Sequence, residues 1–171
     1  MYTDGGMKEY RCGTILSSIG VHFGHGHPDN VSRIVFSVYD NNVAEAKAVL
    51  EALNIASNND VKKIRIFTDS QSTIDIINSP KVQELYRRKQ ANVPLPLAAK
   101  GTRLYFKCPC TFNLIFDHIH SSFDDVEIIF VKGHNDVGLF GQEGNTAADR
   151  LAFEALEAAA ANAGLRNKTS K

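Results

Sequence analysis

The chain has 171 residues, of which 43% are hydrophobic and 22% charged, and this composition is typical of one globular domain rather than a disordered or fibrous chain. Its 19 basic and 19 acidic side chains cancel, so the overall charge does not indicate a polyanionic partner. No apolar stretch is long enough for a membrane-spanning helix, and the N-terminus has no hydrophobic signal core, which disfavours membrane insertion and secretion. Three cysteines are too few, and odd in number, for a disulfide framework, which fits an intracellular setting. We expect the nucleus or cytoplasm, and the mitochondrion is a further alternative.

The first half of the chain predicts strands followed by alternating helices and strands. A short extended run carries Asp4, and β-branched and aromatic residues over 11–23 and 33–39 predict two hairpin strands separated by a glycine-rich and histidine-rich turn. Apolar residues then recur with helical spacing from Asn42, a candidate N-cap, to about Ala56. A short strand over 63–68 and a helix over 70–77, which Pro80 stops, follow.

The second half of the chain contains an irregular basic segment before regular structure returns. Prolines at 94, 96 and 109 predict an irregular insertion over 91–110. A helix over 111–123, a buried strand over 126–131 and a glycine-rich loop over 133–144 precede a helix over 146–162, with Asn145 as its N-cap. We therefore expect one α/β domain over 1–164, built on a five-stranded mixed sheet with an antiparallel start and parallel later strands, and a disordered basic tail over 165–171.

Positive charge is concentrated between Pro80 and Cys110, where seven basic residues accompany one acidic residue, Glu84. A solvated helix face with a loop and a phosphate-contacting patch both fit this distribution. Charge alone leaves both interpretations open.

Four carboxylates stand at positions where a sheet edge and two helix starts could bring them together. Asp4 and Asp69 adjoin predicted strands, whereas Glu45 and Asp149 lie in the first turns of predicted helices. Such a set suits magnesium, which binds oxygen ligands. Each helical carboxylate also has a structural explanation: Glu45 follows Asn42 at the capping-box spacing, and Asp149 would favour the helix dipole.

The residues around these carboxylates form five blocks in chain order that resemble type 1 ribonuclease H. The blocks are Tyr2-Thr3-Asp4-Gly5-Gly6, Asn41-Asn42-Val43-Ala44-Glu45, Phe67-Thr68-Asp69-Ser70, Val131-Lys132-Gly133-His134, and Gly144-Asn145 with Ala148-Asp149-Arg150-Leu151-Ala152. Five ordered blocks are more specific than a lone motif. The resemblance implies the ribonuclease H-like fold and endonucleolytic cleavage of the RNA strand of RNA–DNA hybrids, leaving 5′-phosphate and 3′-hydroxyl ends.

The resemblance also implies roles for individual residues. Asp4 would bridge two Mg²⁺ ions, with Glu45 and Asp69 completing one site and Asp149 the other, and Mn²⁺ should substitute. His134 would carry protons or help product release. The positions implied to contact substrate, in part through RNA 2′-hydroxyls, are Gly5, Gly6, Asn41, Asn42, Ser70 and Asn145. The basic segment over 81–107 would grip the hybrid backbone.

Some positions depart from the family pattern. The chain opens three residues before Asp4, which predicts a truncated first strand, and the segment between His134 and Asp149 is longer than usual. Val38 and Asp40 stand where a DNA-phosphate pocket is common, and Ser72 replaces an aromatic position. A catalytically impaired nucleic-acid-binding or scaffold module is therefore the alternative hypothesis. In either case we expect a monomer or a part of a longer polypeptide, bound to RNA–DNA hybrid and not to a membrane.

Overall fold

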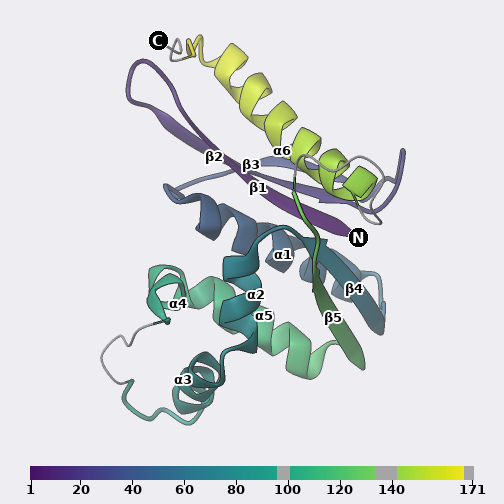
Figure 1. Cartoon of the computed structure of the whole chain (residues 1–171), viewed down its shortest axis with the longest axis vertical. Helices are drawn as coiled ribbons and strands as arrows, with labels where there is room; N and C mark the ends of the chain where they lie inside the picture. The colour runs from purple at the N-terminus through teal and green to yellow at the C-terminus, as the bar shows by residue number, and fades with distance from the viewer. Residues whose placement is uncertain (96–100, 134–141, 168–171) are drawn as a thin grey trace.

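The computed structural model describes residues 1–95, 101–133 and 142–167 (Figure 1). The strands are β1 (Tyr2–Glu9), β2 (Ile15–His22), β3 (Val31–Val35), β4 (Lys63–Thr68) and β5 (Asp125–Phe130). The helices are α1 (Asn41–Asn58), α2 (Gln71–Asn78), α3 (Pro80–Gln90), α4 (Arg103–Lys107), α5 (Pro109–Ser121) and α6 (Gln142–Asn162).

The strands form one mixed sheet in the order β3-β2-β1-β4-β5. Strand β2 pairs antiparallel with both β1 and β3, whereas β4 runs parallel to both β1 and β5. The antiparallel start followed by parallel strands confirms the expected sheet. The β1–β4 pairing is short, since it joins only Tyr2 to Phe67 and Thr3 to Thr68.

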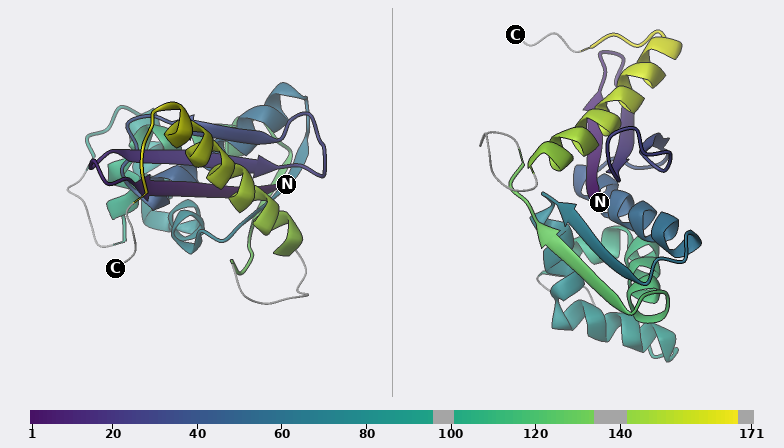
Figure 2. Two further views of the ribbon diagram at one scale, coloured as in Figure 1. Left: turned by 90° about the horizontal axis from the view of Figure 1, so that it is seen from above. Right: turned by 90° about the vertical axis from the view of Figure 1, so that its right-hand side faces the viewer.

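Helices cover both faces of the antiparallel strands, with α6 on one face and α1 on the other (Figure 2). Gly20 permits the close approach of α6 to β2, because a Cβ atom there would lie 2.0 Å from the carbonyl oxygen of Ala148. The main core lies around α1, where Val49 and Leu53 pack with Ile66 of β4 and Phe112 of α5. Burial of these apolar side chains is the main stabilising contribution to such a layered fold.

The predicted strand over 33–39 is wrong in its second half, because β3 ends at Val35. Ser37 has a φ of 58°, in the left-handed region, which ends extended pairing. Phe36, which lies within the predicted strand, is therefore 82% exposed. The predicted buried strand over 126–131 also differs, since β5 is an edge strand whose residues are half-buried or exposed.

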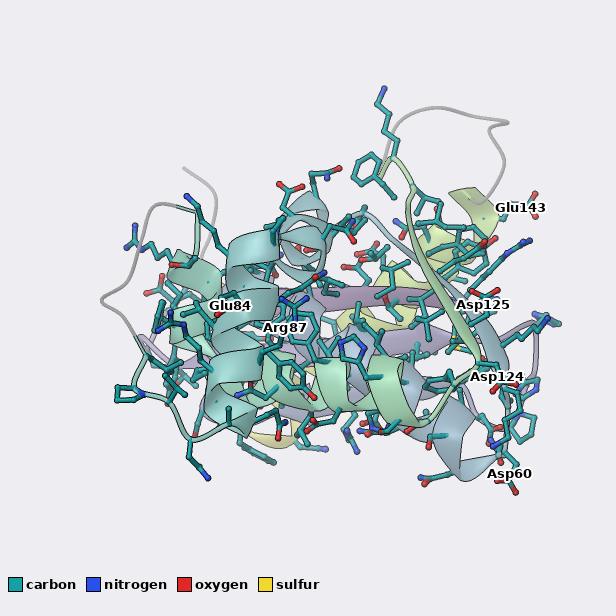
Figure 3. The ribbon with its side chains drawn as sticks, turned by 90° about the horizontal axis from the view of Figure 1, so that it is seen from below. Asp60, Glu84, Arg87, Asp124, Asp125 and Glu143 are labelled. Carbon is teal, nitrogen blue, oxygen red and sulfur yellow. The ribbon has the colours of Figure 1, made fainter. Side chains whose placement is uncertain are left out.

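The predicted irregular insertion over 91–110 is wrong where α4 and the start of α5 occupy it. Pro80 and Pro109 are each the first residue of a helix, a position where proline's fixed φ and missing N–H are tolerated. Residues 96–100 of the insertion lie outside the described residues. On α3, Arg87 and Arg88 both pair with Glu84, and Figure 3 shows Arg87 and Glu84 at the surface, so this part of the basic segment is a solvated helix face.

The last helix and the tail also differ from expectation. Helix α6 begins at Gln142, so Asn145 lies inside its first turn rather than at its N-cap. In the expected disordered tail, the N–H of Arg11 donates to the carbonyl of Arg166 at 3.1 Å, and Tyr10 forms a bridge with Asn167. The tail is thus paired as far as residue 167, and 168–171 lie outside the described residues. Among the helices described, none combines the length and apolarity needed to cross a membrane.

Candidate active site

Asp4 and Asp69 are neighbours because of the β1–β4 register. Thr3 is the partner of Thr68, so the next residue of each strand carries a carboxylate at the same level of the sheet. Asp69 directly follows β4, as expected. Asp4, however, is the third residue of β1 rather than its end, because β1 continues to Glu9 in pairing with β2. The parallel register, and not a shared strand end, brings these two carboxylates together.

Helix α6 supplies the third carboxylate, Asp149, from the face of the sheet that it covers. The helix begins at Gln142, so Asp149 lies beyond the first turn, where the helix dipole no longer has an appreciable effect. The structural explanation offered for Asp149 therefore fails. Close contact of Gly144 with Tyr2, whose ring would lie 2.2 Å from a Cβ atom on that glycine, seats the start of α6 against the start of β1.

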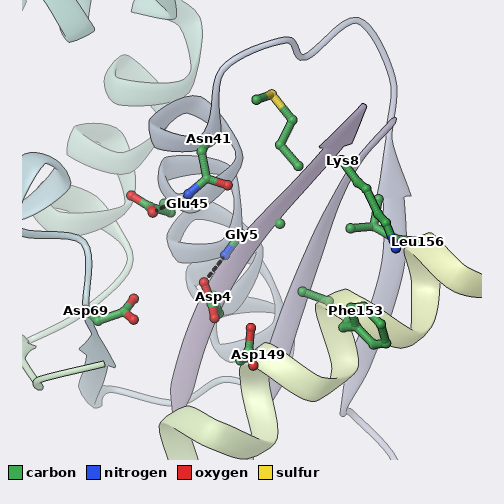
Figure 4. A pocket seen from close by; sticks show the side chains of 12 residues that line it. Asp4, Gly5, Lys8, Asn41, Glu45, Asp69, Asp149, Phe153 and Leu156 are labelled. Carbon is green, nitrogen blue, oxygen red and sulfur yellow. Dashed lines mark hydrogen bonds between the residues drawn. The ribbon is translucent and has the colours of Figure 1, made fainter. Parts of the chain in front are cut away.

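A pocket of about 460 Å³ holds these carboxylates together with Glu45. In Figure 4, Asp4 lies between Asp69 on one side and Asp149 on the other. The pocket is lined by Asp4, Gly5, Gly6, Met7, Lys8, Asn41, Glu45, Asp69, Asp149, Ala152, Phe153 and Leu156. Four carboxylates from β1, α1, the end of β4 and α6 thus share one cavity, as expected from the sequence.

Asp4 is the most deeply buried carboxylate of this group, with 8% of its surface exposed. Burial, reinforced by the negative charges of Asp69, Asp149 and Glu45, raises the pKa of Asp4 to about 8. One hydrogen bond acts in the opposite direction, because the backbone N–H of Gly5 donates to Oδ1 of Asp4 at 2.7 Å. The site therefore holds more negative charge than its surroundings compensate.

Glu45 is held by two neutral donors on its two carboxylate oxygens. The side-chain amide of Asn41 donates to Oε1 at 2.7 Å, and the hydroxyl of Ser70 donates to Oε2. Burial raises the pKa of Glu45, which the Ser70 hydrogen bond counteracts. Asp40, and not Asn42, caps α1 by accepting from the N–H of Asn42 at 3.0 Å. The capping-box explanation for Glu45 is therefore wrong, and its carboxylate belongs to the pocket.

A chain of polar contacts extends from Asn42 to α4. The side chain of Asn42 donates to Asp40 at 3.1 Å and accepts from the hydroxyl of Ser72 at 2.7 Å. Asp40 in turn forms an ion pair with Lys107 of α4, which is the main cause of the lowered pKa of this carboxyl group. The sequence showed Asp40 and Ser72 only as departures from a pattern. The structure makes them the partners that orient Asn42.

Asn145 is 2% exposed and faces the carboxylates. Its amide donates to Oδ2 of Asp69 at 3.3 Å, while its own Oδ1 has no hydrogen-bond partner among the described residues. Gly133 also approaches Asp69, since a Cβ atom on the glycine would lie 2.2 Å from Oδ2. His134, the fifth predicted catalytic residue, lies outside the described residues. Sequence reasoning missed Lys8 and Phe153, which line the pocket without belonging to any motif.

The donor set suits a hard divalent cation. All four acidic groups offer oxygen ligands, the kind that Mg²⁺ and Mn²⁺ prefer, and a cation would offset both the burial and the negative neighbours that raise the pKa of Asp4. Within the described part of the chain, no three histidine, cysteine, aspartate or glutamate side chains already stand close enough to ligate one ion. The carboxylates therefore fit a metal site in their chemistry and share one cavity, but they stand apart in this structure.

Comparison with known proteins places this arrangement in a family. Residues 1–157 match the family described as RNase H. A ribonuclease H of Clostridium botulinum strain Hall is 26% identical over 157 residues, which cover 92% of this chain and 94% of that protein.

Two solved structures share the fold. LC11-RNase H1 in complex with RNA/DNA hybrid has a TM-score of 0.53 and 18% identity, with 92% of this chain and 96% of that chain covered. A foamy viral protease-reverse transcriptase in complex with RNA/DNA hybrid has a TM-score of 0.65 and 20% identity, with 90% of this chain but 19% of that chain covered. At these identities the two structures bear on the fold alone.

Proposed function

Because the chain belongs to the RNase H family, it hydrolyses the RNA strand of RNA–DNA hybrids, and we propose that it does so endonucleolytically with two Mg²⁺ ions bound by the carboxylate pocket. The products would carry 5′-phosphate and 3′-hydroxyl ends, and Mn²⁺ would substitute for Mg²⁺. The observation that carries this proposal is the meeting of carboxylates from β1, α1, β4 and α6 in one cavity.

Asp4 is proposed to serve both ions, with Glu45 and Asp69 on one side and Asp149 on the other. Its place between Asp69 and Asp149 and its raised pKa support this role, since the most buried carboxylate gains most from cationic partners. When bound, such ions lower the pKa of an attacking water and offset charge on the phosphate. Asn145 supports the site by orienting Asp69, and Ser70 by a hydrogen bond that counteracts the raised pKa of Glu45.

Recognition of the hybrid is proposed to use the backbone at Gly5 and Gly6 with the side chains of Asn41 and Asn42. Both amides lie at the start of α1, and Asn42 is held in place by Asp40 and Ser72. Amide groups can donate to and accept from ribose 2′-hydroxyls, which distinguish RNA from DNA without reading base sequence. Ser70 and Asn145 are proposed to act through Glu45 and Asp69, and His134 as a proton carrier.

The test is cleavage of an end-labelled RNA–DNA hybrid in Mg²⁺ or Mn²⁺, with duplex RNA and single-stranded RNA as competing substrates. We expect cleavage of the hybrid alone and 5′-phosphate ends on the products. Asp69→Asn should abolish cleavage while preserving the fold, because the amide keeps the size of the carboxylate. Asp124→Asn is the matched control, since it makes the same chemical change on an exposed residue outside the pocket.

Each alternative hypothesis has its own outcome. Cleavage of duplex RNA as well would contradict selectivity for the hybrid. A folded protein that binds the hybrid but cleaves nothing in either metal would support the impaired binding or scaffold module. The crowded carboxylates argue against that module, because a site without cations would keep their mutual repulsion.

A further inference from the structure

The pocket extends beyond the carboxylates to a second group of side chains with different chemistry. At this end lie Met7 and Lys8 of β1 and Phe153 and Leu156 of α6. Lys8 is the one cationic side chain among the described residues that line the pocket. The acidic and the cationic ends of this single cavity are therefore distinct.

Strand geometry fixes how the two ends are related. Side chains alternate along β1, so Asp4, Gly6 and Lys8 point to the face covered by α6. Four residues of strand span about 13 Å, so the backbone at Lys8 lies well away from the backbone at Asp4. Gly6, between them, is closely packed, because a Cβ atom there would lie 2.9 Å from the Ser18 hydroxyl and 3.2 Å from Leu156.

Lys8 is held in place over an aromatic ring. Its ammonium lies 2.6 Å from Oε1 of Glu157 and 5.3 Å from the ring centroid of Phe153. Its side chain remains 27% exposed, so the ammonium still has room for a further acceptor. Phe153 is 51% exposed although it lines a cavity, and Met7 is 40% exposed. An aromatic face beside a cation is the combination that proteins use to hold single strands of nucleic acid.

We propose that Lys8 and Phe153 form a subsite for the cleaved strand, in which Lys8 contacts a backbone phosphate one or two nucleotides from the scissile phosphate and Phe153 packs against the adjoining nucleotide. This inference rests on the proposed function, because it places the scissile phosphate at the carboxylates. Lys8 supplies a cation for the part of the strand that lies beyond the carboxylates, inside the same cavity. Glu157 acts as a positioning residue that holds the ammonium over the ring.

The first test measures binding of a fluorescent hybrid to the full chain as a function of salt, in an Asp69→Asn background that blocks cleavage. Lys8→Met should weaken binding and lower the slope of log Kd against log salt by about one, the loss of one phosphate contact. Arg65→Met is the matched control, because Arg65 forms a comparable ion pair with Glu127 at 2.5 Å outside the pocket. That control should leave affinity and slope unchanged.

The aromatic contact has a separate signature. Phe153→Ala should weaken binding without changing the salt slope, because it removes packing against the nucleotide but no charge. Phe153→Tyr should restore affinity, because it keeps the ring. Thermal unfolding of each variant shows whether a loss of binding is caused by a loss of stability.

The second test locates the phosphate. A series of hybrids is prepared, each with a single uncharged methylphosphonate at a different position on either side of the scissile phosphate of the RNA strand. At one position the methylphosphonate should weaken binding to the protein that retains Lys8 and have no effect on binding to Lys8→Met. That position identifies the contacted phosphate and the side of the scissile phosphate on which it lies.

Three outcomes bear on the proposal and on the function beneath it. An unchanged salt slope for Lys8→Met, with only a lower Tm, would show that Lys8 is a structural partner of Glu157 and would overturn the subsite. Equal methylphosphonate effects in both proteins would overturn it as well. Absence of hybrid cleavage by the unmodified chain would instead contradict the proposed function, so the two failures are distinguishable.

Discussion

The backbone of Gly5 in β1 lies directly against the backbone of Glu45 in α1. A Cβ atom on Gly5 would stand 2.2 Å from the amide nitrogen of Glu45, a separation that no side chain can occupy. Gly5 directly follows Asp4 in the chain, and Glu45 is itself one of the pocket carboxylates. This contact therefore sets how far the helix stands from the strand, and with it the spacing of the carboxylates.

Gly5→Ala should consequently separate α1 from β1. We expect a loss of about 1–3 kcal/mol in the free energy of unfolding, the usual cost of overpacking, and a larger proportional loss of cleavage. Gly24→Ala is the matched control, because a Cβ atom at Gly24 meets no atom within 4 Å. Urea denaturation and hybrid cleavage measure the two effects. Wild-type stability and activity in Gly5→Ala would contradict the role given to this contact.

The raised pKa of Asp4 predicts an unusual pH dependence of the metal-free protein. Its pKa is about 8 in the folded chain and near 3.9 in an unfolded one, so the folded state binds more protons between these values. The free energy of unfolding should therefore fall as pH rises from about 4 to about 8, by up to about 1.4 kcal/mol per pH unit, and then level off. Denaturation in EDTA across this range measures it.

Two comparisons isolate the contribution of Asp4. The variant Asp4→Asn should have a flatter profile, because it removes the titrating group. Addition of Mg²⁺ to the wild type should restore stability at neutral pH. A wild-type profile identical to that of Asp4→Asn would contradict the buried, repelled state of this carboxyl group.

Asp69→Asn should increase the stability of the metal-free protein although it abolishes cleavage. Removal of one of the charges that raise the pKa of Asp4 should increase the metal-free free energy of unfolding at pH 7 by about 1 kcal/mol, while cleavage is lost. The Mg²⁺-dependent rise in Tm should shrink in the same variant, whereas Asp124→Asn keeps it. Equal loss of stability and activity would instead indicate that Asp69 is mainly structural.

Ser70→Ala should raise the pKa of Glu45 as well as lower the stability of α2. Ser70 caps α2 by accepting from the N–H of Thr73, so the substitution should cost about 1 kcal/mol. It also removes the hydrogen bond that lowers the pKa of Glu45, so Mn²⁺ binding at pH 6 should weaken more than at pH 8. Calorimetric titration at the two pH values measures this difference.

The matched control for Ser70→Ala is Ser79→Ala. Ser79 caps α3 in the same manner, by accepting from the N–H of Val82, but contacts no pocket carboxylate. This variant should lose similar stability with unchanged metal binding. If both variants bind Mn²⁺ equally well at both pH values, Ser70 does not influence Glu45.

The amino-acid sequence by itself indicated the family, the mixed sheet and the four carboxylates. Those features depend on local patterns: alternating apolar residues in strands, helical spacing in α1, and motif residues in a fixed chain order. It misplaced helix ends at Asn42 and Asn145, because several polar residues near each helix start could serve as the cap, and packing selects among them. It also missed that prolines 80 and 109 start helices.

Only the tertiary structure decided how the carboxylates are held and what lies beside them. The β1–β4 register places Asp4 and Asp69 one residue beyond the Thr3–Thr68 pair, and the Gly5–Glu45 contact holds α1 against β1. Because α6 begins at Gln142, Asp149 lies beyond its first turn. The contacts of Glu45 with Ser70, and of Lys8 with Phe153 and Glu157, join residues distant in sequence. No local pattern encodes such contacts, because they depend on how the strands and helices pack against one another.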